Sequence, residues 1–396
     1  VTADADATPG NIQCTVTMTA GTDEYPYQET ETLNLDLTLS QFGFPLDGIV
    51  VKSSPVVADL NNDGLKEIYF GSDNEALHGY NSFGEEIDGF PFQSTDRVRS
   101  SPAVGDVDND GQMEIVFGNS AGKLYIINHD GTQQLAYTIL GFIEGTPALV
   151  DVDGDQDLEI AFTTTTTSGG QLYVIHHNGI TMSGFPKELG SMWAGPAIHD
   201  IDNDGAYDVV CSTYDKEVYA IEVNGGAIKA GFPVVLEGRL DVSPTIVDVD
   251  GDGDYEIAVG SNDGELYVFH YDGTIFAQYD TGDDIRGGIS ICDLNNDGQL
   301  DLLFGGYDDK IHVWDPVANE LLPGWPVDIG FNILSEPIIA DLDGDGQVEV
   351  LAARKTGKIF GLESDGSMMT NFPIAVDGSI ESTPAIEDID SDGDLE

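Results

Sequence analysis

Basic residues are scarce in this chain of 396 residues. It holds 14 Lys and Arg against 72 Asp and Glu, which gives a formal charge of −58. A nucleic-acid partner is excluded, because binding to phosphates needs a basic surface. Membrane insertion is not expected either, because no apolar run approaches the roughly 20 residues of a membrane span. The excess acid predicts bound cations, a saline setting that screens the charge, or both.

Cysteine and helical periodicity are also scarce. The three cysteines, Cys14, Cys211 and Cys292, form no CxxC pair and show no zinc-site spacing. No stretch keeps apolar residues at a sustained 3.6-residue period, so few helices are expected. Apolar residues still make up 40% of the chain, which is enough for a large core and argues against wholesale disorder. The predicted fold class is all-β.

One acidic stretch of nine residues occurs eight times, at spacings of 45 to 49 residues. In the second copy it reads "DVDNDGQME", residues 106–114. Short β-branched and aromatic runs flank the copies, one before each copy and three after each of the first seven, and Gly, Asn or Asp end these runs. Such runs are typical of strands. Four strands in a period of this size predict a β-propeller blade, with the acidic stretch joining the first strand to the second.

The repeated pattern, D-x-[DN]-x-[DN]-G-x-x-[DE], places side-chain oxygens at positions 1, 3, 5 and 9. Carboxylates this close repel one another unless a cation lies between them. Ca²⁺ takes six to eight hard oxygen ligands, and Gly at position 6 permits the sharp turn. In the third copy Gln156 replaces this Gly, so we expect the weakest or most distorted metal site there. The predicted Ca²⁺ ligands are Asp59, Asn61, Asp63, Glu67, Asp106, Asp108, Asp110, Glu114, Asp151, Asp153, Asp155, Glu159, Asp200, Asp202, Asp204, Asp208, Asp248, Asp250, Asp252, Glu256, Asp293, Asn295, Asp297, Asp301, Asp341, Asp343, Asp345, Glu349, Asp388, Asp390, Asp392 and Glu396.

The acidic loop between runs such as "SSPAVGDV" and "EIVFG" resembles the FG-GAP/VCBS repeat. That repeat occurs in the propellers of integrin α-subunits and in many secreted or surface proteins. The resemblance covers roughly residues 42–396 and implies a Ca²⁺-binding propeller in an extracellular, secreted or cell-surface protein. Such propellers serve adhesion, glycan binding and occasionally polysaccharide cleavage, so the resemblance does not decide between these functions.

The repeats predict a propeller of eight blades, with seven blades as the alternative. Residues 42–396 form the propeller, and the eighth blade would combine a segment at 42–48 with the last copy, which is truncated within its repeat. Residues 1–41 carry two runs of period two and no acidic loop, so they are interpreted as the end of an immunoglobulin-like β module plus a linker. We therefore expect further domains in a longer parent chain.

A possible ligand-binding face lies at the blade ends opposite the acidic loops. Five residues in or beside the connections to the first strands are the predicted ligand contacts: Lys52, Arg99, Trp193, Arg239 and Arg286. Cations with an aromatic platform could hold an acidic glycan or a protein loop. The alternative is that these charges pair with carboxylates across the mouth of the propeller.

Three functions remain open from the sequence. The first is a binding module for adhesion or for capture of a glycan or protein. The second is a structural spacer or filament subunit. The third, a polysaccharide lyase, is the least favoured, because a lyase needs a base and no motif supplies one. The chain is therefore expected not to be an enzyme.

Overall fold

The computed structural model describes residues 10–22, 25–37, 44, 46, 48–391, 393 and 395–396. The chain divides into two compact units, Val1–Asp47 and Gly48–Glu396. In the first unit, β1 (Gly10–Thr22) and β2 (Tyr25–Leu37) pair antiparallel as a two-stranded sheet. A single hairpin does not establish the immunoglobulin-like module, which stays a prediction.

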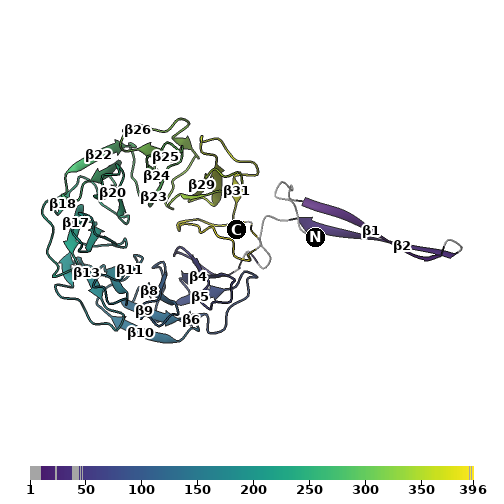
Figure 1. The fold of residues 1–396 in the computed structure, drawn as a ribbon, viewed down its shortest axis with the longest axis horizontal. Helices are drawn as coiled ribbons and strands as arrows, with labels where there is room; N and C mark the ends of the chain where they lie inside the picture. Colours follow the sequence, from purple (N-terminus) through teal and green to yellow (C-terminus); the bar gives the residue numbers. More distant parts are fainter. Residues whose placement is uncertain are drawn as a thin grey trace. The chain divides into compact units, whose positions relative to one another are not determined.

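The second unit is a ring of seven blades around a central axis (Figure 1). Each blade is an antiparallel sheet whose strands follow one another in chain order from the centre outward. The first strands of neighbouring blades contact each other, so they line the centre. The all-β propeller of four-stranded blades is therefore confirmed.

Blades one to four contain the following strands. Blade one has β3 (Val56–Ala58), β4 (Glu67–Ser72), β5 (Ala76–Tyr80) and β6 (Phe92–Gln93). Blade two has β7 (Ala103–Gly105), β8 (Glu114–Gly118), β9 (Lys123–Asn128) and β10 (Gln133–Thr138). Blade three has β11 (Ala148–Val150), β12 (Glu159–Thr163), β13 (Gly170–Ile175) and β14 (Lys187–Leu189). Blade four has β15 (Ala197–His199), β16 (Asp208–Ser212), β17 (Glu217–Glu222) and β18 (Val234–Val235).

Blades five to seven complete the ring. Blade five has β19 (Thr245–Val247), β20 (Glu256–Gly260), β21 (Glu265–Phe269) and β22 (Ile275–Asp280). Blade six has β23 (Ile289–Cys292), β24 (Asp301–Gly305), β25 (Lys310–Asp315), β26 (Glu320–Leu321) and β27 (Val327–Asp328), the last two both pairing with β25. Blade seven has β28 (Ile338–Ala340), β29 (Glu349–Arg354), β30 (Lys358–Leu362) and β31 (Ile374–Ala375).

The prediction of eight blades was wrong. Among the described residues, the stretch from 380 onward forms no strand, and it lies between blade seven and blade one. Thr383 accepts a hydrogen bond from Glu336 N–H of blade seven and donates its own N–H to Ser54 of blade one, at 3.1 and 3.0 Å. Lys52 pairs with Glu381 at 2.7 Å. Within its own repeat this segment shows one residue pair, in which Glu387 and Glu396 exchange two backbone hydrogen bonds at 3.2 and 3.1 Å. One such pair does not make a strand, whose backbone groups need a neighbouring strand along their length.

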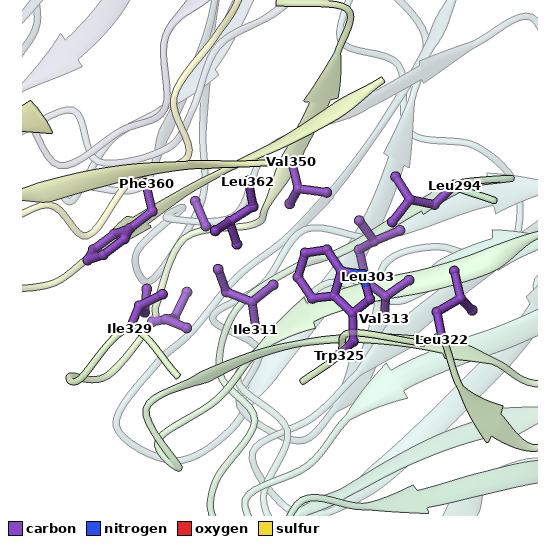
Figure 2. Close-up of a cluster of buried hydrophobic side chains, with 12 residues drawn as sticks. Leu294, Leu303, Ile311, Val313, Leu322, Trp325, Ile329, Val350, Phe360 and Leu362 are labelled. Atoms are coloured by element: carbon purple, nitrogen blue, oxygen red, sulfur yellow. The ribbon is translucent and has the colours of Figure 1, made fainter. Parts of the chain in front are cut away.

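The core lies between adjacent blades. One cluster joins blades six and seven, where Trp325 packs with residues such as Ile311, Val350 and Phe360 (Figure 2). The Trp325 indole N–H also donates to the Ser364 carbonyl at 3.1 Å, across the blade boundary. Burial of apolar surface at roughly 25 cal/mol per Å² is the main force that holds one blade to the next. The ring is thus stabilised blade by blade, and polar loops can project from its two faces.

Candidate metal centres and ligand face

The acidic loops all join a first strand to a second strand, so they share one face of the ring. Position 9 is the first residue of the second strand in every blade, as in the pair Gly105 and Glu114 that closes the loop of blade two. This register places the position-9 side chain under the loop. Because the chain enters each first strand at its other end, the connections between blades lie on the opposite face.

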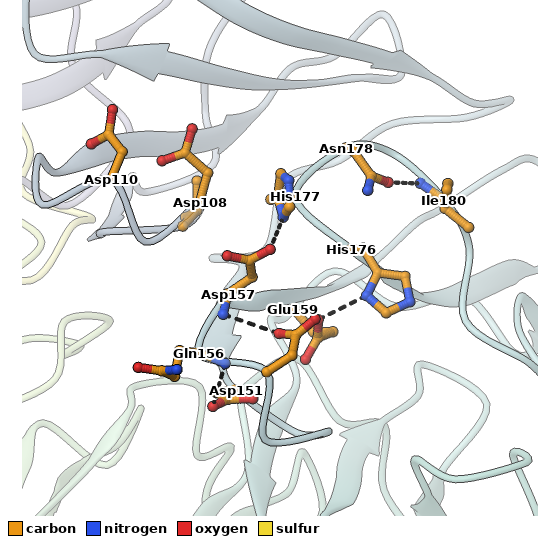
Figure 3. A network of polar contacts seen from close by, with 12 residues as sticks. Asp108, Asp110, Asp151, Gln156, Asp157, Glu159, His176, His177, Asn178 and Ile180 are labelled. Carbon is orange, nitrogen blue, oxygen red and sulfur yellow. Dashed lines mark hydrogen bonds and ion pairs between the residues drawn. The ribbon is translucent and has the colours of Figure 1, made fainter.

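Position 1 holds the turn of each loop together. Its carboxylate accepts the backbone N–H of position 6 in all eight copies, at 2.8 to 3.2 Å. Gly at position 6 has positive φ, 89° at Gly111 for example, a region that side chains disfavour. Gln156 adopts a φ of 80° and still donates to Asp151 at 3.0 Å (Figure 3). The third loop thus keeps the shape of the others.

Position 9 supplies a buried carboxylate. Its side chain accepts the N–H of position 2 in all eight copies, at 2.7 to 3.4 Å. In the first seven loops this side chain is no more than 3% exposed. Burial raises the pKa of all seven groups, to about 7 for Glu114 and Glu256 and to about 6 for Asp208 and Asp301. Without a cation, each of these carboxylates is held in an unfavourable environment.

The loops bring the predicted ligand atoms together. In the second loop, oxygens of Asp106, Asp108 and Glu114 lie within 4.8 Å of one another, and the same holds for Asp59, Asp63 and Glu67 in the first. Asp108 Oδ1 is buried and accepts no hydrogen bond. An all-oxygen donor set with such an unsatisfied atom fits Ca²⁺. Asp392, predicted as a ligand in the eighth copy, lies outside the described residues.

Two histidines that the sequence did not assign to the metal loops contact position 9. His176 Nδ1 lies 2.9 Å from Glu159 in the third loop (Figure 3), and His270 Nδ1 lies 3.3 Å from Glu256 in the fifth. Both follow the third strand of their blade, β13 and β21, at the same place in the repeat. The signal that could have found them is this shared position, opposite the start of the second strand.

The repeats match a known family model. The FG-GAP-like repeat model matches residues 59–117, 106–162, 248–304 and 293–352, which together span just over half of the chain. Each match runs from one acidic loop to the second strand of the next copy. This chain belongs to the FG-GAP-like repeat family. The family assignment agrees with the loop geometry, and no curated protein matches the sequence.

Solved structures similar to this FG-GAP-like chain share its fold at low identity. The V. cholerae biofilm matrix protein Bap1 has a TM-score of 0.66 at 14% identity, over 87% of this chain and 84% of that one. Saccharomyces cerevisiae Sqt1 has a TM-score of 0.63 at 14% identity, over 86% and 90%. Quinohemoprotein alcohol dehydrogenase from Comamonas testosteroni has a TM-score of 0.60 at 12% identity, over 86% and 69%. These likenesses show the propeller fold alone.

The face opposite the metal loops holds a cavity of about 460 Å³ lined by Lys52, Arg99, Glu144, Trp193 and Glu381. The structure therefore brings together three of the five predicted ligand contacts. Trp193 is 42% exposed. The cations are already paired, because Arg99 contacts Asp73 through two nitrogens, at 2.7 and 3.0 Å, and Lys52 contacts Glu381.

The other two predicted contacts do not line this cavity. Arg239 stacks on the ring of Tyr214, with its guanidinium carbon 4.6 Å from the ring centre. Arg286 pairs with Asp284 at 2.7 Å and stacks on Tyr307 at 4.9 Å. Each of these guanidinium groups thus has local partners. No helix among the described residues is long and apolar enough to cross a membrane.

Proposed function

We propose that residues 48–396 form a Ca²⁺-stabilised binding module of a larger secreted or cell-surface protein, which acts in adhesion or in the capture of a glycan or protein. The observation that carries the metal part is the carboxylate buried under each of the first seven loops. Seven such groups, each beside further acidic side chains, are favourable only with a cation present. The module should therefore require Ca²⁺ to be stable.

The metal also argues for a location outside the cell. Extracellular Ca²⁺ modules bind with dissociation constants of roughly 10⁻⁴ to 10⁻³ M, concentrations that the cytosol does not reach. The formal charge of −58 adds to the need for cations, because bound ions neutralise part of it and dissolved salt screens the rest. Bap1 is a biofilm matrix protein, and its likeness in fold is in keeping with a surface role.

Thermal melting tests the metal requirement. The melting temperature should rise with added CaCl₂ and fall in excess chelator, whereas MgCl₂ should substitute poorly because Mg²⁺ demands a tighter octahedral geometry. An unchanged melting temperature in chelator would show that the acidic loops are solvated turns.

The cavity on the opposite face is the proposed ligand site. Trp193 offers a flat apolar surface, and the two cations and two carboxylates that line the cavity leave it without net formal charge. A sugar ring could stack on the indole while its hydroxyls meet Arg99 and Glu144 at the edge of the cavity. We therefore favour a glycan as the ligand, with a protein loop as the alternative.

Glycan-array binding by the Ca²⁺-loaded protein tests this site. Trp193→Ala should remove binding, whereas Phe331→Ala should not, because Phe331 is similarly exposed at 40% but does not line the cavity. Binding that survives Trp193→Ala would place the ligand elsewhere.

A second candidate function is a structural spacer or filament subunit. The ion pairs of Lys52, Arg99 and Arg286 favour it, because three of the four predicted cationic contacts on this face already have carboxylate partners. Absence of binding across the array, in a protein that still melts with Ca²⁺ dependence, would support this reading. A lyase is the weakest alternative, and ultraviolet absorbance of unsaturated products after incubation with pectins would reveal it.

A further inference from the structure

One blade carries a lysine where its counterparts carry apolar residues. The position lies two residues before the Gly or Asn that precedes each aromatic–Pro pair. In five blades the N–H of this residue donates to a carbonyl of the third strand at 2.9 to 3.0 Å, which fixes the structural equivalence. The residues at this position are Ile87, Met182, Lys229, Leu322 and Met369, in blades one, three, four, six and seven.

Lys229 is directed into the fourth acidic loop. Its side chain is only 9% exposed, and its ammonium nitrogen lies 2.7 Å from Asp202 Oδ2 and 2.9 Å from Asp208 Oδ2. These are positions 3 and 9 of the loop, two of the four predicted Ca²⁺ ligands. In the described part of the first seven loops, no other Lys or Arg lies within 4 Å of a predicted ligand carboxylate.

We propose that the Lys229 ammonium takes the place of a metal ion in the fourth loop, so that this blade is held by an internal cation. The inference rests on the proposed function, because it presupposes that the other loops bind Ca²⁺. A Ca²⁺ ion would need oxygens of Asp202 and Asp208 at 2.3 to 2.6 Å. It would then lie close to a fixed positive charge in a partly desolvated site, where repulsion is weakly screened.

The remaining oxygens indicate what removal of the lysine would do. Asp202 Oδ1 and Asp208 Oδ1 are both buried and accept no hydrogen bond. Without the ammonium, two carboxylates would stand together with no counter-ion. The loop otherwise keeps the shared backbone geometry, since Asp200 accepts the N–H of Gly205 at 2.8 Å. A chain that lacks Lys229 should therefore gain a metal site.

The number of Ca²⁺ ions bound per chain tests the inference. Equilibrium dialysis followed by metal analysis would compare the wild-type chain with Lys229→Met, which installs the residue found at Met182 and Met369. We expect one additional ion per chain in the variant. Met369→Lys is the reciprocal change, and it should lose one ion, because the lysine would face the seventh loop.

A second pair of variants avoids any change at Lys229. Asp106→Asn and Asp200→Asn remove the same position-1 carboxylate from the second and fourth loops. Asp106→Asn should lose one ion, and Asp200→Asn should leave the number unchanged. Loss of one ion in Asp200→Asn would show that the fourth loop holds Ca²⁺ beside the ammonium and would overturn the inference, while the proposed function would stand. If no form of the protein binds Ca²⁺, the proposed function fails, and this inference fails with it.

Discussion

Replacing Glu114 with glutamine should change stability in opposite directions with and without Ca²⁺. Burial raises the pKa of this carboxyl to about 7 from an ordinary value of 4.5, which corresponds to about 3 kcal/mol in the metal-free protein at pH 8. The glutamine carries no charge, keeps an oxygen for the Val107 N–H at 3.0 Å, and can donate to the acids around it. In chelator, Glu114→Gln should therefore be more stable than the wild type.

The sign should reverse once Ca²⁺ saturates the loops. A site filled at about 100 times its dissociation constant contributes about 2.7 kcal/mol, and the variant loses a ligand of that site. For a propeller of 349 residues, 3 kcal/mol corresponds to a shift of about 4 °C in melting temperature. Melting at pH 8 in chelator and in excess CaCl₂ measures both shifts, with the exposed Glu85→Gln as the control. If Glu114→Gln lowers the melting temperature equally in both conditions, the buried carboxylate does not destabilise the metal-free protein and does not act through bound Ca²⁺.

Three further results are expected. Gln156→Gly should stabilise the protein by about 1 kcal/mol, because it relieves a φ of 80°; melting measures this, and Gln112→Gly, where φ is not positive, should lower the melting temperature. In chelator, the raised pKa values of Glu114 and Glu256 mean that the folded state binds protons more tightly, so stability should fall as pH rises from about 4.5 to 7; melting across this range with and without Ca²⁺ checks it, since Ca²⁺ should remove the decline. Stability should also rise with NaCl at saturating Ca²⁺, because seven bound ions, with the fourth loop held by Lys229, would still leave a formal charge of −44; a melting temperature that falls with NaCl would contradict this.

The acidic loops were predictable residue by residue, because the ligand order and the Gly recur at a nearly constant period. One copy would have been ambiguous, whereas eight copies fix the strands on either side. Gln156 is instructive, because its sequence departure predicted distortion, yet the backbone takes the same turn at Gln156 as at Gly111. The surrounding loop fixes the backbone of the turn, so Gln156 adopts a positive φ that side chains disfavour.

The blade count could not be read from the repeats. Both the segment before the first blade and the one after the seventh resemble parts of a blade, and the sequence does not say whether they pair. Most of the predicted segment at 42–48 lies outside the described residues. Val51, which follows it, bridges to Ser72 of β4, as Phe142 does to Thr165 in blade three, so Val51 belongs to an ordinary connection into blade one.

Side-chain contacts between distant parts of a repeat were harder to predict from the sequence than the blade count. Lys229 reaches Asp202 from 27 residues away in sequence, and only an alignment of all copies marks it as unusual. On the opposite face, spacing placed Lys52, Arg99 and Trp193 together correctly. The spacing could not reveal that acids such as Asp73 already pair with these cations. Asp73 lies 26 residues before Arg99, in a different loop.

The segment between blades seven and one has a consequence for the order of assembly. Its contacts join residues that are 329 positions apart, as in Thr383 with Ser54 and Glu381 with Lys52. Each blade can form from neighbouring residues as the chain emerges, but this junction needs both ends of the unit at once, and long loops make such contacts slow. We therefore expect circular closure to be the last step of folding, so that the chain becomes a closed ring only when these contacts between its two ends have formed.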